Sequence, residues 1–191
     1  MRNSWTGIFA ALAYTCLWLM PAARADGLGY SYTELSGFHV HADTGGGGHG
    51  GRLALSYALS GNAFMYTGAA QSGFDTTRSR RYDFGIGINT SADTGYSLFA
   101  ALGWNHVGND NAAAPGVQDH GFGASLGIRA LLSDRWEIYA LASTAHNDAL
   151  AQRSRGEYGA LYAVSKAVSL GAAVAANPGQ SEYLLSLRVY Y

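Results

Sequence analysis

The sequence predicts an all-β protein, namely a transmembrane antiparallel up-and-down β-barrel of about ten strands, with eight strands as the alternative count. Two observations favour this fold. Apolar residues alternate with small or polar ones at a period of two in segment after segment, which is the pattern of a strand with two different faces. Only 13% of the 191 residues are charged, about half the share of an ordinary soluble domain. A wall that contacts lipid needs few charged side chains.

The N-terminus predicts a cleaved export signal, so that residues 1–25 form a signal peptide and residues 26–191 form the barrel domain. Arg2 is a basic start, and an apolar stretch runs from Ile8 to Met20. Ala23-Arg24-Ala25 places small residues at the positions that a signal peptidase requires. An uncleaved N-terminal anchor is the less favoured alternative, because the apolar stretch is short for a membrane span.

The clearest strand covers residues 95–105. One face is apolar with an aromatic residue at each end, as expected for a strand that crosses hydrocarbon between two headgroup regions. Nine further segments follow the same rule, and the alternation is least regular at Glu34 to Gly37, where a β-bulge is the predicted cause. The predicted strands are 28–41, 50–59, 63–74, 80–90, 95–107, 119–132, 136–146, 155–164, 168–176 and 182–191.

The connections between these strands alternate in length. Short turns that open with serine, such as Ser60-Gly61-Asn62 and Ser133-Asp134-Arg135, alternate with longer links such as 42–49 and 108–118. Outer-membrane barrels have short periplasmic turns and longer extracellular loops. An even number of strands with both termini in the periplasm therefore fits the pattern, and ten strands satisfy it.

Two sets of outward residues have predicted roles in the membrane. Aromatic residues near the strand ends should form a girdle at the interfaces; they are Tyr82, Tyr96, Trp104, Phe122, Trp136, Tyr158, Tyr183 and Tyr191. The outward stripe of the last strand is similar to the signal that barrel-assembly machinery recognises; it consists of Tyr183, Leu185, Leu187, Val189 and Tyr191.

Several short motifs carry a family resemblance. They are Leu28-Gly29-Tyr30-Ser31-Tyr32-Thr33-Glu34, Gly51-Arg52-Leu53-Ala54-Leu55-Ser56, Tyr82-Asp83-Phe84-Gly85-Ile86-Gly87 and Gly159-Ala160-Leu161-Tyr162. With them the chain resembles the small outer-membrane barrels whose expression is tied to a diffusible signal factor, and more broadly the OmpA- and OmpX-like class. The resemblance implies a location in the outer membrane and its vesicles, with roles in signalling, motility or biofilm behaviour. It implies no enzymatic activity.

The inward face carries most of the strand charges, and their signs nearly balance. Since an isolated buried charge is costly, we expect these groups to pair and fill a narrow lumen. A narrow small-solute channel lined by the same residues is the alternative. The predicted lumen charge network is Arg52, Arg81, Asp83, Arg129, Glu137, Arg155, Glu157, Glu182 and Arg188.

Neither a metal site nor a catalytic site is predicted. His106, His120 and His146 lie on consecutive strands near Asp110 and Asp119, and such a group could bind a divalent metal. Scattered histidines in exposed loops are the commoner situation, and we expect no metal and no cofactor. Catalysis at the rim would need a nucleophile beside a base, but Ser143 should face away from His146.

The expected function is therefore that of a non-enzymatic barrel with a filled lumen, acting in envelope structure or in cell-surface interaction and signalling through its extracellular loops. A small-solute channel is the alternative, and an enzyme at the rim is less expected. The expected location is the outer membrane of a Gram-negative envelope, reached by Sec export. Expected partners are outer-membrane lipid, lipopolysaccharide, the barrel-assembly machinery and periplasmic chaperones, with no nucleic acid and an unidentified extracellular partner.

Overall fold

The computed structural model describes residues 28–43, 46–74, 77–90, 95–111, 114–147 and 153–191. Within them the chain forms ten strands, which close into one antiparallel barrel, so the predicted fold is confirmed and the count is ten rather than eight. The predicted signal peptide lies outside the described residues. The strands are β1 (Tyr32–Ala42), β2 (Gly47–Ser60), β3 (Ala63–Phe74), β4 (Thr77–Asn89), β5 (Tyr96–Asn111), β6 (Ala114–Leu131), β7 (Trp136–Asn147), β8 (Arg153–Ala163), β9 (Val168–Asn177) and β10 (Gln180–Tyr190).

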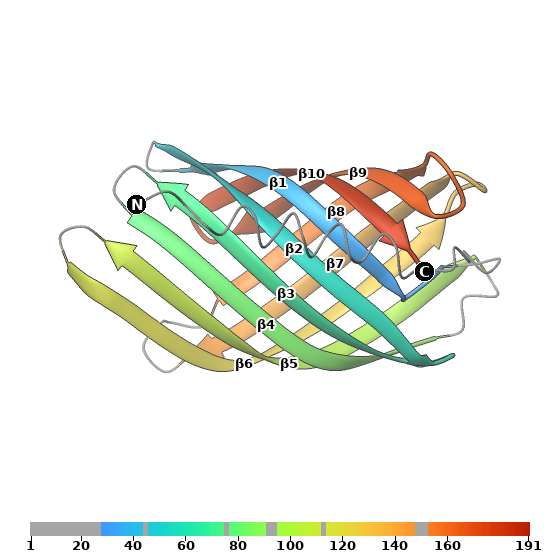
Figure 1. Ribbon diagram of the computed structural model, residues 1–191, viewed down its shortest axis with the longest axis horizontal. Coiled ribbons are helices and arrows are strands. Elements are labelled where there is room, and N and C mark those ends of the chain that lie inside the picture. Colours follow the sequence, from blue (N-terminus) through green and yellow to red (C-terminus); the bar gives the residue numbers. More distant parts are fainter. Residues whose placement is uncertain (1–27, 44–45, 75–76, 91–94, 112–113, 148–152) are drawn as a thin grey trace.

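Each strand pairs with its neighbours in the sequence, and β1 pairs with β10 to complete the cylinder. Figure 1 shows the strands tilted across the barrel, as closure of a sheet requires. The start of β1 and the C-terminus lie at one end of the barrel, and we call these two points the termini. The β5–β6 hairpin extends farthest at the other end. No helix among the described residues is long and apolar enough to cross a membrane.

The predicted strand bounds were too short at the end of the barrel opposite the termini. Strands β2, β4 and β6 begin three to five residues earlier than predicted, and β5 ends at Asn111 rather than at residue 107. Hydrophobic alternation marks only the part of a strand that faces hydrocarbon. The backbone ladder continues beyond that part, because inter-strand hydrogen bonds do not depend on the side chains.

The irregular alternation at Glu34 to Gly37 does not reflect a β-bulge, so that prediction was wrong. The register of β1 runs without a shift against both β10 and β2. The shifts lie elsewhere, near Ala58 in the β2–β3 pair and near Asn109 in the β5–β6 pair. The pattern at Glu34 is irregular because its carboxylate and Ser36 face the lumen, while Gly37 faces outward.

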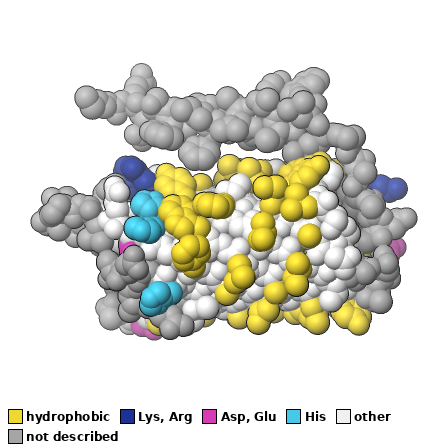
Figure 2. Space-filling view, turned by 90° about the horizontal axis from the view of Figure 1, so that it is seen from below, with side chains coloured by type: hydrophobic (Ala, Val, Ile, Leu, Met, Phe, Trp, Pro, Cys, Tyr) yellow, Lys and Arg dark blue, Asp and Glu magenta, His cyan; other side chains and the backbone are white. Residues whose placement is uncertain are grey.

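A band of exposed apolar side chains surrounds the barrel. Figure 2 shows these side chains spread over the visible face of the wall, with histidines at one end of it. Leu102, Ile86 and Leu126 are each about two-thirds exposed in the isolated chain. Such a surface would aggregate in water, and it matches the outward band of a transmembrane barrel.

A charge in the middle of this band should destabilise the barrel. Leu102→Arg is expected to lower the free energy of unfolding in lipid vesicles by about 2–4 kcal/mol, because an arginine on the lipid face at the bilayer midplane has that cost. Urea unfolding followed by tryptophan fluorescence measures the change. Leu132 is equally exposed but lies in the β6–β7 turn, so Leu132→Arg is the control and should cost about 0–1 kcal/mol. Equal costs at the two positions would contradict the membrane placement.

Candidate functional site: a side-chain-filled lumen

The residues just before β1 turn into the lumen of the barrel. Leu28 and Tyr30 are buried, and the Tyr30 ring stacks on Phe64 with 4.9 Å between ring centroids. Phe99 packs edge-on against both rings. The Tyr30 hydroxyl is 3.0 Å from the Ser97 hydroxyl oxygen across the lumen. We call Leu28–Tyr30 the N-terminal plug, because it occupies the end of the lumen where the chain termini lie.

Glycines on β4 and β6 make room for these rings. A Cβ at Gly87 would lie 2.3 Å from the Phe64 ring, and one at Gly127 would lie 2.4 Å from the Phe99 ring. No real Cβ tolerates such distances, so each position needs glycine for close approach. One side of the inner wall is thus nearly bare, and the aromatic side chains from β3 and β5 fill the space that it leaves.

A cluster of buried charges lies next to the plug. Glu137 on β7 accepts hydrogen bonds from Arg129 at 2.7 and 3.1 Å and from the Tyr190 hydroxyl at 3.2 Å. Arg188 on β10 is ion-paired with Glu34 at 2.6 Å and lies 3.6 Å from Glu137. We call these groups the lower ionic cluster.

Cation–π contacts link the lower ionic cluster to the aromatic rings. The Arg129 guanidinium lies 4.8 Å above the Tyr30 ring and donates to the Gly29 carbonyl at 2.8 Å. Arg188 lies 4.2 Å above the Tyr32 ring. Glu137 is 1% exposed, so these charges are compensated by one another rather than by water. The lower ionic cluster therefore fixes the N-terminal plug in place.

A second set of charges crosses the lumen farther from the termini. Arg52 on β2 is 3.5 Å from Glu157 on β8, and these strands are separated by β1, β10 and β9 in the barrel order. Glu157 also pairs with Arg155 at 2.9 Å, and Arg155 pairs with Glu182 on β10. We call these four groups the upper ionic cluster. They form a chain of side chains across the interior.

All nine charged residues of the predicted lumen network lie on the inward face. Seven of them belong to the two ionic clusters. The remaining two, Arg81 and Asp83, lie on β4 facing the upper cluster, where Arg81 is within the electrostatic influence of Arg52, Arg155, Asp83 and Glu182. Which of these charged residues form ion pairs could not be predicted from the sequence, because that depends on the total shift in strand register around the closed barrel.

Sequence reasoning missed Glu34, Tyr30 and Tyr190. Glu34 was interpreted as part of a bulge, and Tyr30 was placed in a strand. Tyr190 is 2% exposed, and its inward position follows from the alternation with Leu187 and Val189, so that signal was present. Asp119, which was considered as a metal ligand, is 2% exposed on the inner face of β6. It therefore points away from His106 and His120, which face outward.

The histidines lie on strands. The expectation that they are scattered over exposed loops was therefore wrong. His106 lies opposite His120 across the β5–β6 pair, and His39 lies opposite His49 across the β1–β2 pair. Among the described residues, no group of three or more metal-ligating side chains is placed to hold a metal ion. Ser143 and His146 face opposite sides of β7, as expected from their spacing.

Seven of the eight predicted girdle residues lie at two levels of the outer wall. Tyr82, Trp104, Phe122 and Tyr183 lie toward the end that is remote from the termini, whereas Tyr96, Trp136 and Tyr191 lie toward the termini. Tyr158 lies at the middle of β8. The Tyr191 hydroxyl donates to the Ser56 carbonyl at 3.1 Å. The proposed assembly stripe, Tyr183, Leu185, Leu187, Val189 and Tyr191, alternates with inward residues on β10 and its end, and its role in assembly stays a prediction.

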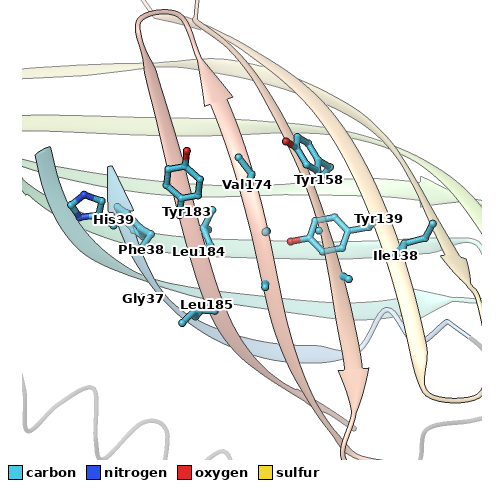
Figure 3. Close-up of a pocket in the computed structure, with 14 residues that line it drawn as sticks. Gly37, Phe38, His39, Ile138, Tyr139, Tyr158, Val174, Tyr183, Leu184 and Leu185 are labelled. Carbon is cyan, nitrogen blue, oxygen red and sulfur yellow. The ribbon is translucent and has the colours of Figure 1, made fainter. Parts of the chain in front are cut away.

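An apolar hollow of about 990 Å³ lies on the outer wall over β1 and β7–β10 (Figure 3). Its floor is low where Ala172 on β9 and Ala160 on β8 lie side by side, and Leu185 on β10 and Gly37 on β1 continue the same outward row. Tyr183 and Tyr158 stand on either side of Val174 in the next row. The hollow opens to the outside of the barrel, so it is not part of a path through the lumen.

Comparison with known proteins shows the fold. No protein-family model matches the sequence, and no curated protein matches it. Solved structures that are similar include the NanC porin, with a TM-score of 0.53 and 7% identity over 83% of this chain and 99% of that chain. Another is the KdgM porin in complex with disordered oligogalacturonate, with a TM-score of 0.50 and 10% identity over the same shares. The chain thus has the fold of outer-membrane β-barrels, while the resemblance to barrels tied to a diffusible signal factor stays a prediction.

Proposed function

We propose that the protein is a non-enzymatic outer-membrane barrel with a closed lumen, which acts in envelope structure or in cell-surface interaction and signalling through the loops remote from its termini. The proposal includes export to the periplasm by way of residues 1–25, insertion by the barrel-assembly machinery, and contact with lipopolysaccharide. The apolar band and the two levels of aromatic residues support the membrane location.

The observation that carries the closed lumen is the upper ionic cluster. A water-filled channel keeps its charged side chains hydrated on the wall, so that ions can enter and leave. Here Arg52 and Glu157 instead reach toward each other from strands that are not neighbours. The N-terminal plug supplies a second obstruction at the end near the termini. A narrow solute channel, the alternative function, would have to bypass both.

Ion conductance tests the proposal. The full-length mature barrel, inserted into planar bilayers, is expected to produce no stepwise current, because two independent layers of side chains cross its lumen. A porin of known conductance inserted in the same bilayers is the positive control, and heat-modifiable migration on gels shows that the sample is folded. Steady openings from the folded wild-type barrel would overturn the closed-lumen proposal and favour the channel.

A further inference from the structure

All six histidines of the protein occupy outward register positions near the strand ends that are remote from the termini. Five are exposed, and His106 is half-buried between aromatic neighbours. A random distribution would place some of them in the lumen or near the termini. The six residues are His39, His41 and His49 on β1 and β2, His106 and His120 on β5 and β6, and His146 on β7.

Two arginines join the histidines on one side of the barrel. Arg78 and Arg80 are exposed at the start of β4, at the two outward positions that precede Tyr82 on that strand. Tyr82, His106 and His120 lie side by side across three strands. We call Arg78, Arg80, His106 and His120 the basic patch. Figure 2 shows histidines gathered at one end of the wall, beside hydrophobic side chains.

An aromatic strip borders the basic patch on its membrane side. Phe84 and Trp104 lie 5.4 Å apart by ring centroids, and the Trp104 ring is nearly parallel to that of His106 at 5.9 Å. Tyr82 also stacks on His106, at 6.3 Å. Going from the strand ends toward the middle of the wall, cationic residues come first, aromatic rings next and aliphatic residues last. The same order suits a surface that passes from lipid headgroups into hydrocarbon.

The depth of the patch agrees with that order. Tyr96 begins β5 near the termini, and His106 is ten residues farther along the strand. Ten residues span about 33 Å of strand, or roughly 23 Å along the membrane normal at a tilt of about 45°. The apolar band of such barrels is about 25 Å tall. His106 and His120 therefore lie at the level of the lipid headgroups, and Arg78 and Arg80 lie just beyond them.

The acidic groups of this region face mainly the other way. Asp83 on β4 and Asp119 on β6 point into the lumen, on the opposite side of the sheet from the basic patch. Among the described side chains next to the patch, the titratable groups on the outer side are Tyr82 on β4 and His146 on β7. Asp110 takes the register position opposite Arg78. The two arginines of the patch and the carboxylates of Asp83 and Asp119 therefore lie on opposite sides of the sheet.

We propose that the basic patch binds the phosphate groups of a phosphorylated glycolipid in the outer leaflet, that is, the lipid A part of lipopolysaccharide. Arg78 and Arg80 contact phosphate with charge-assisted hydrogen bonds, and the aromatic strip packs on the acyl chains. His106 and His120 lie beside the arginines at the level of the headgroups. This inference rests on the membrane location proposed above.

Binding of two lipids by the refolded full-length barrel in detergent micelles tests the inference. The probes are lipid A with both phosphates and the same lipid after enzymatic removal of its phosphates. Arg78→Gln combined with Arg80→Gln is expected to weaken binding of the phosphorylated lipid by about tenfold or more, since each basic residue near a lipid surface contributes appreciably. The matched control is Arg135→Gln with Lys166→Gln, which removes two exposed cations from the turns at the other end of the barrel; it should change binding by less than about twofold.

Equal binding of the dephosphorylated lipid, or no effect of the arginine substitutions, would overturn the basic patch. Insertion of each variant into phosphatidylcholine vesicles is measured separately by heat-modifiable migration. A wild-type barrel that fails to insert would refute the membrane location itself.

Discussion

Glu137→Ala is expected to lower the free energy of unfolding in vesicles by about 3–5 kcal/mol, the cost of removing one partner from a buried ion pair. The carboxylate accepts from Arg129 and from the Tyr190 hydroxyl, and Arg188 lies 3.6 Å away. Its loss leaves the buried Arg129 guanidinium in contact with the Gly29 carbonyl and the rings of Tyr30 and Tyr32, none of which carries a negative charge to compensate it. Urea unfolding, with the fraction folded measured by heat-modifiable migration, gives the value.

Two companion variants separate the ion pair from a general effect of mutation. Arg135→Ala removes an exposed arginine from the β6–β7 turn and should change stability by less than about 0.5 kcal/mol. Arg129→Met combined with Glu137→Leu replaces both charged groups with apolar ones and should recover most of the loss, because no unpaired charge remains beside Arg188, which keeps Glu34. A loss below about 1 kcal/mol for Glu137→Ala would show that water reaches this cluster.

Opening the lumen should require removal of both obstructions at once. Tyr30→Ala removes the largest side chain of the N-terminal plug, and Arg52→Ser with Glu157→Ser removes the contact that spans the upper part. Either change alone is expected to leave the barrel closed, whereas the triple variant is expected to show stepwise current in planar bilayers. Tyr30→Ala should also cost about 3 kcal/mol of stability, since a buried aromatic side chain is truncated.

Comparison of these variants shows which obstruction blocks ions. If Tyr30→Ala alone conducts, the upper ionic cluster does not block ions. If Arg52→Ser with Glu157→Ser conducts, the N-terminal plug does not block ions. Tyr57→Ala, on the outer wall, is a control for nonspecific leak. A triple variant that is folded yet silent would show that further side chains, such as Val40 and Leu184, close the lumen.

Much of the fold follows from a single property of the sequence. Alternation with a period of two assigns Arg129 and Glu137 to the inner face and Leu102 to the outer face, because neighbouring side chains on a strand point in opposite directions. The same alternation assigns His106 to the outer face, because it follows Trp104 at the next outward position. The error at Glu34 arose where the inner and outer faces differ little in polarity, so that the period gives no strong register.

The contacts that close the lumen could not be predicted in this way. Tyr30 bonds to Ser97, 67 residues away, and Arg129 bonds to Gly29, 100 residues away. Which groups meet across a barrel depends on the total stagger of its strands, which is a property of the closed cylinder rather than of any segment. The N-terminal plug was missed for the same reason, since aromatic residues next to a strand look like more strand until the space that they fill is known.

The pairing of β1 with β10 has a consequence for how the barrel forms. Every other strand pairing joins consecutive strands and can arise as a local hairpin, whereas this seam joins segments that are 154 residues apart at the Arg188–Glu34 ion pair. Because the entropic cost of closing a loop grows with its length, we expect this pairing to form last. Until then the interior is open to water, and Glu34 and Arg188 remain hydrated on separate edges. The two charges are dehydrated in the same step that brings them together, so the folding chain never has to bury either one alone.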